Sequence, residues 1–411
     1  MTLPVTIGVS INFSDGPQYA QALLLDTGIL DTNVLANNAA LIVDYSTQST
    51  QIAIRRGRDL INDVYNTGSA TVKILDPDGD FNPSNTLSPI YGFVKPLRKI
   101  QITATYSSTT YNLFSGYISE YRYSYPTGQE TGFVTVSAFD AFKIFNLATI
   151  STVTGATAGQ DTGTRIDKIL DEISWPASMR SISTGDTPCI ADTGASRTAL
   201  AAIRIAEFSE LGAFFIDPQG NAVFKSRTET IETAGGTPTV FNQTGGIPYA
   251  NLKFALDDKL IINSANITRA GGTMQSHTDT ASVDTYFLHS VNSSNLIMQT
   301  DAIALEVAQL YVASRSQTDL RIDSMTLDLM SPNYSAGITA ALSMDYFSPV
   351  TISNIQPNGD TITRTLQIQG VSHDITPNTF VSTFTTMEPI TDGFLLDSTF
   401  WGILDTSVLS Y

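Results

Sequence analysis

Alternating apolar and polar residues cover most of the chain and predict β-strands. Val134, Val136 and Ala138 alternate with a threonine and a serine, which is the period of a strand with one buried face. Similar patterns predict strands at 101–106, 112–119, 260–269, 321–329, 350–355, 361–371 and 380–387. Turn residues separate these segments, as in Pro-Asn-Gly-Asp at 357–360. The chain is therefore predicted to be mainly β.

Three segments instead show apolar residues at helical spacing: 166–173, 197–211 and 301–311. The first stops before Pro176, because proline ends a helix. The second is predicted to stop at Gly212, and residues 214–224 after it are predicted to form a β-hairpin. Thr300 can cap the third helix, and Asp301 suits the positive end of its dipole.

These elements divide the chain into two β regions separated by a different region. The predicted segments are an N-terminal docking segment at 1–40, a first β domain at 41–150, a small α+β insertion at 151–245, a second β domain with one helix at 246–390, and a C-terminal docking tail at 391–411. The first β region fits a small barrel or sandwich. The two β regions are consistent with an internal repeat, although their identity is too low to establish one.

Both ends of the chain carry a similar short sequence. Residues 23–35 and 394–409 share the core GILDTxVL. This similarity arises either by chance, in a chain rich in Leu, Asp and Thr, or because both ends form similar docking elements.

Charge and composition exclude several classes of protein. Only 15% of the residues are charged, and the net charge is −17. Such a surface repels nucleic acid, so a DNA-reading function is not expected, although an acidic surface would let DNA slide past. No apolar run approaches the roughly 20 residues that span a bilayer, and the N-terminus lacks the pattern of a signal peptide. We therefore expect no membrane insertion and synthesis in a cytoplasm.

No catalytic, cofactor-binding or metal-binding site is predicted. The only histidines are His277, His289 and His373, and none lies near a GxSxG elbow or at a zinc-ligand spacing. Cys189 is the one cysteine, so no intrachain disulfide is possible. Paired carboxylates of a glycosidase are not excluded, because 39 acidic residues make some pair inevitable. Only Trp175 and Trp401 are available for an aromatic sugar cleft.

Two charged clusters have alternative interpretations. Asp76-Pro-Asp-Gly-Asp80 is either a turn or a calcium-binding loop, because alternate acids place oxygens on one side. It lacks the twelve-residue spacing of an EF-hand. The basic residues Arg55, Arg56 and Arg58 are predicted to form a solvated face or an interprotomer ion pair rather than a DNA contact.

Within residues 51–145 a series of motifs resembles minor tail and baseplate (tail-tip) hub proteins of long-tailed bacteriophages. Its members are IAIRRGR at 52–58, GSATV at 68–72, LDPDGDFNP at 75–83, SPIY at 88–91 and LFSG at 113–116. The chain differs from the family pattern at two positions: it has Asp76 where the family often has Asn, and Ile90 between Pro89 and Tyr91. Residues 206–221 and 366–377 resemble later motifs of the same family. These positions determine the fold and are not catalytic.

The resemblance implies a structural virion protein with two tube-like β-barrel domains in each chain. Hubs of this kind are typically homotrimers, in which two such domains per chain form a pseudo-hexameric ring. The ring joins the six-fold tail tube to a central fibre or spike and lines the DNA channel. The implied partners are distal tail or tail tube proteins, the fibre or spike, the tape measure protein, and genomic DNA only in passing. The implied location is the phage tail tip.

Three other functions remain open at this stage. One is a receptor-contacting minor tail protein, and the second is a tail-associated cell-wall hydrolase. The third is a module that binds surface glycans, which would require exposed aromatic residues.

Overall fold

The computed structural model describes most of the chain of 411 residues. The described ranges are 3–14, 16–17, 41–60, 63–125, 131–318, 320–331 and 335–388. The C-terminal docking tail, most of the N-terminal docking segment, and the two similar sequences at 23–35 and 394–409 lie outside the described residues.

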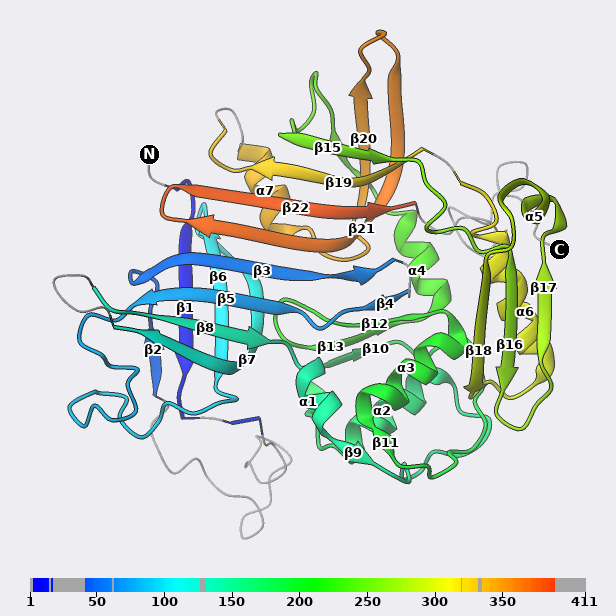
Figure 1. Ribbon diagram of the computed structural model, residues 1–411, viewed down its shortest axis with the longest axis horizontal. Helices are drawn as coiled ribbons and strands as arrows, with labels where there is room; N and C mark the ends of the chain where they lie inside the picture. Colours follow the sequence, from blue (N-terminus) through cyan, green and yellow to red (C-terminus); the bar gives the residue numbers. More distant parts are fainter. Residues whose placement is uncertain are drawn as a thin grey trace.

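One sheet of 14 strands forms the body of the molecule (Figure 1). The first half-sheet comprises β1 (Thr6–Asn12), β2 (Ile42–Asp44), β3 (Ser49–Asp59), β4 (Val64–Tyr65), β5 (Ser69–Leu75), β6 (Lys99–Tyr106), β7 (Thr109–Ser124) and β8 (Phe133–Phe139). The second half-sheet comprises β14 (Thr239–Phe241), β15 (Asn251–Ala255), β19 (Arg321–Asp328), β20 (Pro349–Ile355), β21 (Thr361–Thr376) and β22 (Thr379–Met387). The main path runs β15-β19-β22-β21-β3-β5-β8-β7-β6-β1-β2.

The predicted alternation is confirmed in β8. Val134, Val136 and Ala138 are buried, whereas the residues between them are half-buried. The same alternation in β5 and β6 directs apolar side chains into one core. Each fully buried valine or isoleucine contributes about 1.5–3 kcal/mol to folding, so this pattern selects the register of the sheet.

The two half-sheets are continuous with each other rather than separate. β3 pairs with β21 from Ile52 opposite Ile375 to Gly57 opposite Gly370. The mainly β prediction is confirmed, but the expected pair of tube-like barrels is not found, since in the described residues the sheet does not close on itself. The physical reason is that β3 would have to pair within its own half to close a barrel, and its free edge is instead used by β21.

The described residues of the region 151–245 contain three of the seven α-helices. They include α2 (Thr162–Glu172), α3 (Ala199–Glu210) and α4 (Arg227–Ala234), with a small sheet of β10 (Arg180–Ile182), β12 (Ala213–Ile216) and β13 (Ala222–Lys225). Just before it lie α1 (Phe142–Leu147) and β9 (Thr149–Ile150), and β9 pairs with β11 (Arg197–Thr198). The predicted helices at 166–173 and 197–211 and the hairpin at 214–224 are confirmed.

The end of α3 differs from the prediction in one residue. Leu211, with φ of 58°, takes the left-handed position that we expected of Gly212. Glycine is needed at 212 for close packing instead, because a Cβ there would lie 2.8 Å from the Lys225 carbonyl and from the Phe224 ring.

A lateral unit projects from the second half-sheet between β15 and β19 (Figure 1). It comprises β16 (Ser264–Arg269), β17 (Gln275–Thr278), β18 (Ser290–Leu296), α5 (Thr280–Tyr286) and α6 (Asp301–Ala313), with its own apolar core. The Thr300 side chain accepts a hydrogen bond from the Ile303 N–H, so the predicted cap is confirmed. With α7 (Ser335–Ser343), the described residues of 246–390 form three helices rather than the one predicted. The sequence pattern missed α5 and α7 because both are short and lack a long apolar stripe.

Candidate assembly surface

The two half-sheets repeat the same strand topology. β3, β5, β6, β7 and β8 correspond in chain order and in spatial order to β15, β19, β20, β21 and β22. Every pairing among them is antiparallel in both halves. β1 and β14 both lie beside the equivalent strands β6 and β20, although β1 is antiparallel and β14 parallel. An internal repeat, suspected from the sequence, is therefore visible in the topology.

The register of the repeat is defined residue by residue. Lys99 lies opposite Tyr117 and Pro349 opposite Gln367, so a shift of 250 residues superimposes the two hairpins. The β-bulges obey the same shift, since they follow Ile118 in β7 and Ile368 in β21. Hydrogen bonds from the Leu97 N–H to the Ile118 carbonyl and from the Phe347 N–H to the Ile368 carbonyl also correspond.

Leu97 and Phe347 also share an uncommon backbone conformation. Their φ angles are 63° and 64°, which non-glycine residues rarely adopt. Two unrelated turns would not reproduce both this conformation and the same hydrogen bond. The repeat therefore extends to the detail of its turns.

The junction of the two half-sheets shows how one repeat unit packs against the next. His373 and Ile375 of β21 lie opposite Ile54 and Ile52 of β3. Both β21 residues are only 3% exposed, and both isoleucines are buried. The edge of β3 thus covers the C-terminal half of β21 and completes a shared apolar core.

Buried ion pairs connect this junction to the rest of the chain. Arg56 pairs with Asp345 at 2.9 Å and donates at 2.9 Å to the Ile216 carbonyl. Burial alone would lower the pKa of Arg56, but Asp345, Tyr346 and Asp140 together outweigh it, and the pKa is raised. One side chain of the first half-sheet therefore contacts both the second half-sheet and the insertion.

A second network ties β3 to the lateral unit. Asp63 accepts from Arg58 at 2.6 Å and from Arg315 at 2.7 Å, and Tyr311 donates to its other oxygen at 3.1 Å. Burial alone would raise the pKa of Asp63, but the two guanidinium charges lower it overall. No local sequence pattern indicated Asp63, because two of its partners, Tyr311 and Arg315, lie far from it along the chain.

The prediction for the basic cluster is therefore wrong for two of its three residues. Arg56 and Arg58 form buried pairs within the chain rather than a solvated face or an interprotomer pair. Only Arg55 is solvated, with half of its side chain exposed beside Asp374. The physical reason is that β3 is an inner strand of the continuous sheet, so side chains on one of its faces are enclosed.

Two stretches of the repeated units lack a strand partner on one side among the described residues. β15 ends the main path, and no described strand pairs with its outer edge. On the β6 side of β7 the ladder ends at Ile118, which bonds Leu97 and Arg98. In the described part of the chain no strand pairs with residues 119–124 on that side, although β3 covers the equivalent stretch of β21.

The candidate nucleophiles and bases are dispersed. His277 lies on β17, and His289 Nε2 lies 3.0 Å from the Tyr286 carbonyl. His373 Nδ1 is 2.9 Å from Ser382 Oγ, and both residues are buried on the paired strands β21 and β22. Burial raises the pKa of Cys189 to about 12, which disfavours its reactive thiolate.

Two buried carboxyls have pKa values raised by burial to about 7, namely those of Asp140 and Glu210. Asp140 accepts from the Gly68 and Phe142 N–H groups at 2.6 and 3.0 Å. Glu210 accepts from three backbone N–H groups, of Asp186, Thr187 and Arg227. Both side chains therefore fix loops and have no exposed oxygen to offer a substrate.

The Asp76–Asp80 loop is organised by its own hydrogen bonds. Asp76 is buried and accepts from the Asp80 N–H at 2.8 Å, the Phe81 N–H at 3.3 Å and the Tyr125 hydroxyl at 2.7 Å. Among the described residues, no three His, Cys, Asp or Glu side chains are grouped to hold a metal ion. The geometry favours the turn interpretation over the calcium loop.

Asp76→Ala is expected to lower stability by about 1–3 kcal/mol, because it leaves two backbone N–H groups and a tyrosine hydroxyl without their acceptor. Asp78→Ala is the matched control, since Asp78 is exposed, and its effect is expected to stay within about 0.5 kcal/mol. Urea denaturation of the three proteins, with and without calcium, measures both. A calcium-dependent stabilisation of the wild type that Asp76→Ala abolishes would contradict this interpretation.

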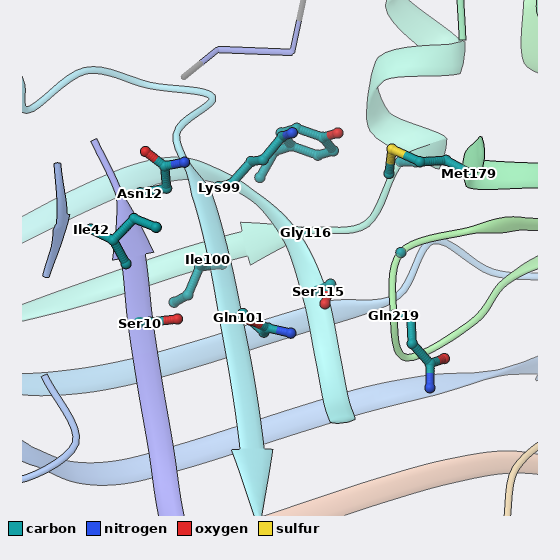
Figure 2. Close-up of a pocket in the computed structure, with 13 residues that line it drawn as sticks. Ser10, Asn12, Ile42, Lys99, Ile100, Gln101, Ser115, Gly116, Met179 and Gln219 are labelled. Carbon is teal, nitrogen blue, oxygen red and sulfur yellow. The ribbon is translucent and has the colours of Figure 1, made fainter. Parts of the chain in front are cut away.

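A pocket of about 280 Å³ lies against the outer face of β1, β6 and β7. Figure 2 shows Ser10, Lys99 and Gln101 on the strands, with Met179 and Gln219 on the opposite side. Its lining contains no carboxylate and no histidine, so it lacks the acid–base pair that hydrolysis of a glycan requires.

Comparisons with known proteins agree with this architecture. No family model matches the chain, and no curated protein matches it. A Neisseria meningitidis tail protein shares the fold with a TM-score of 0.58 and 10% identity, covering 94% of this chain and 97% of that one. A 43 kDa tail protein of the Shewanella oneidensis prophage MuSo2 gives a TM-score of 0.55 with 13% identity, covering 85% of this chain and 96% of that one.

A chain of the Francisella PdpA–VgrG complex gives a TM-score of 0.50 with 9% identity, covering 93% of this chain and 57% of that one. At these identities the comparisons establish the fold alone. The chain has the fold of phage tail proteins, as its sequence motifs indicated.

Proposed function

We propose that this chain is a structural hub of a phage tail tip, and that copies of it assemble into a ring. The observation that carries the proposal is the repeated five-strand unit, in which the outer edge of β15 and the β6 side of residues 119–124 of β7 lack a strand partner among the described residues. Open edges are avoided in stable monomers because they pair with other chains. A ring of copies would pair these two stretches with each other.

The repeat also supports an assembly of three copies. Each chain contributes two equivalent units, so three chains contribute six, which matches a six-fold tube on one side and a three-fold fibre or spike on the other. The partners on this proposal are distal tail or tail tube proteins, the fibre or spike and the tape measure protein, and the location is the virion tail tip.

The acidic surface suits a passage for DNA. With a net charge of −17, a channel through the ring would repel phosphates and hold no strand. The tail-protein fold, together with the burial of Asp140, Glu210 and His373, favours this structural role over a cell-wall hydrolase. No helix in the described residues is long and apolar enough to cross a membrane.

Light scattering of the purified chain tests the proposal. The expected result is a particle of three times the chain mass of 44.3 kDa, either alone or after mixing with a tail tube or distal tail protein. A chain that stays monomeric under both conditions would overturn the ring. Cell-wall cleavage by the wild type in a zymogram would favour the hydrolase instead.

A further inference from the structure

The intrachain junction predicts the contact between copies. We propose that the free edge of β15 in one copy pairs, antiparallel, with residues 120–125, the end of β7 and Tyr125, in the next copy. This inference rests on the proposed ring and specifies the strands and register that would hold it together. β3 already makes the equivalent contact with β21 inside each chain.

The register follows from rows of residues across each half-sheet. Ile52, Val72, Val136 and Tyr121 lie side by side in the first half. The equivalent row in the second half is Leu252, Met325, Phe384 and Val371. Leu252 of β15 therefore occupies the position that Ile52 occupies in β3.

The same correspondence identifies the partners of β15. Ile52 lies opposite Ile375 of β21. Because β21 and β7 are related by a shift of 250 residues, Tyr125 is the position equivalent to Ile375. Leu252 is thereby placed opposite Tyr125 of the next copy. By the same step Lys253 faces Ser124, and Phe254 faces Tyr123.

Exposure of these side chains supports a missing partner. Tyr123 and Tyr125 are 36% and 42% exposed, whereas His373 and Ile375 at the equivalent positions are each 3% exposed. The tyrosines share a strand face with Tyr121, which packs against the core, and they stay partly exposed although the Tyr125 hydroxyl donates to Asp76. Their rings stack at a centroid distance of 6.2 Å and present a flat apolar surface.

The edge of β15 offers the matching surface. Leu252 and Phe254 are only partly buried, whereas Ile52 and Ile54 of β3 are fully buried. Cross-strand pairs of aromatic residues are among the more stabilising pairs in sheets. Because one copy contributes β15 and the other β7, the contact is heterologous and generates a closed ring or a filament.

Cysteine cross-linking tests the register. The double variant Lys253→Cys, Ser124→Cys is expected to form covalent oligomers on mild oxidation, up to a closed trimer on a non-reducing gel. The control Lys253→Cys, Thr110→Cys places the second thiol on the opposite half of β7, in the stretch already paired with β6, and should not cross-link. The native Cys189 is buried and does not interfere.

A surface variant tests the interface without relying on cysteine chemistry. Tyr123→Lys would replace the stacked ring with a charged side chain that the contact must desolvate, and the dissociation constant of the oligomer is expected to rise about 100-fold. Leu147→Lys, at the exposed end of α1 and outside both strands, is the control.

The outcomes separate this inference from the proposed function. Specific cross-linking together with loss of the oligomer in Tyr123→Lys would support both. The strand pairing is overturned, and the ring left intact, if the wild type is a trimer but the double cysteine variant does not cross-link and Tyr123→Lys stays trimeric. A wild type that is monomeric with and without its tail partners overturns the ring, and the strand pairing falls with it.

Discussion

Asp63→Asn is expected to destabilise the folded chain by about 3–5 kcal/mol. Asn preserves the size of the side chain and tolerates the backbone of residue 63, whose φ is 60°. It removes the carboxylate that bridges Arg58 and Arg315, whose side chains are 9% and 8% exposed. Two buried cations without a counter-charge are costly, because neither the protein nor water then compensates for their lost hydration.

Asp374→Asn is the matched control for this effect. It makes the same chemical change at the other end of the β3–β21 junction, but its pair with Arg55 is more than half exposed. Exposed pairs contribute about 0–1 kcal/mol, so the control should change stability little. The urea denaturation midpoints of the two variants and the wild type measure the loss of stability in each variant. Equal losses in both variants would show that the Asp63 network does not hold the lateral unit to the sheet.

Local sequence patterns predicted the elements of this fold better than their arrangement. The strand at 134–138, the cap at Thr300 and the hairpin turn at 357–360 depend on neighbouring residues, and all three are confirmed. The turn follows from the N–H of Gln356 bonding the carbonyl of Asp360. Such features are encoded within a few residues, so they can be read from one sequence.

The continuous sheet could not be predicted in the same way. Nothing near Ile52 or Ile375 signals that strands more than 300 residues apart lie side by side, because strand pairing depends on the whole topology. The internal repeat could be suspected from the sequence but not established, since equivalent positions such as Tyr123 and His373 carry different residues. Arg56 and Arg58 appeared exposed for the same reason, because charged residues are seldom buried unless distant partners enclose them.

His373→Gln is expected to protect the chain against acid. Burial, followed by the charges of Arg56 and Arg55, lowers the pKa of His373 from 6.5 to about 3. Below pH 6.5 the unfolded chain therefore binds a proton that the folded chain does not, and stability is lost as the pH falls. The loss from this group should be on the order of 2 kcal/mol by about pH 5, at the junction of the two half-sheets.

Two other buried groups act in the opposite direction. The pKa values of Asp140 and Glu210 are raised to about 7, so their contribution to stability is present at low pH and is lost as the pH rises through 7. Both groups remain in the variant, so the difference in unfolding free energy between His373→Gln and the wild type isolates the imidazole. That difference should grow steadily in favour of the variant below pH 6.5.

Ser382→Ala separates the charge of the imidazole from its hydrogen bond. It removes the partner of His373 Nδ1 but leaves the ring buried beside Phe380, so it should lower stability by about 1 kcal/mol at every pH. The acid-side slope of the wild type should remain in this variant and disappear only in His373→Gln. Parallel pH profiles for all three proteins would mean that His373 is protonated as readily in the folded chain as in the unfolded one, and that the junction tolerates the charge.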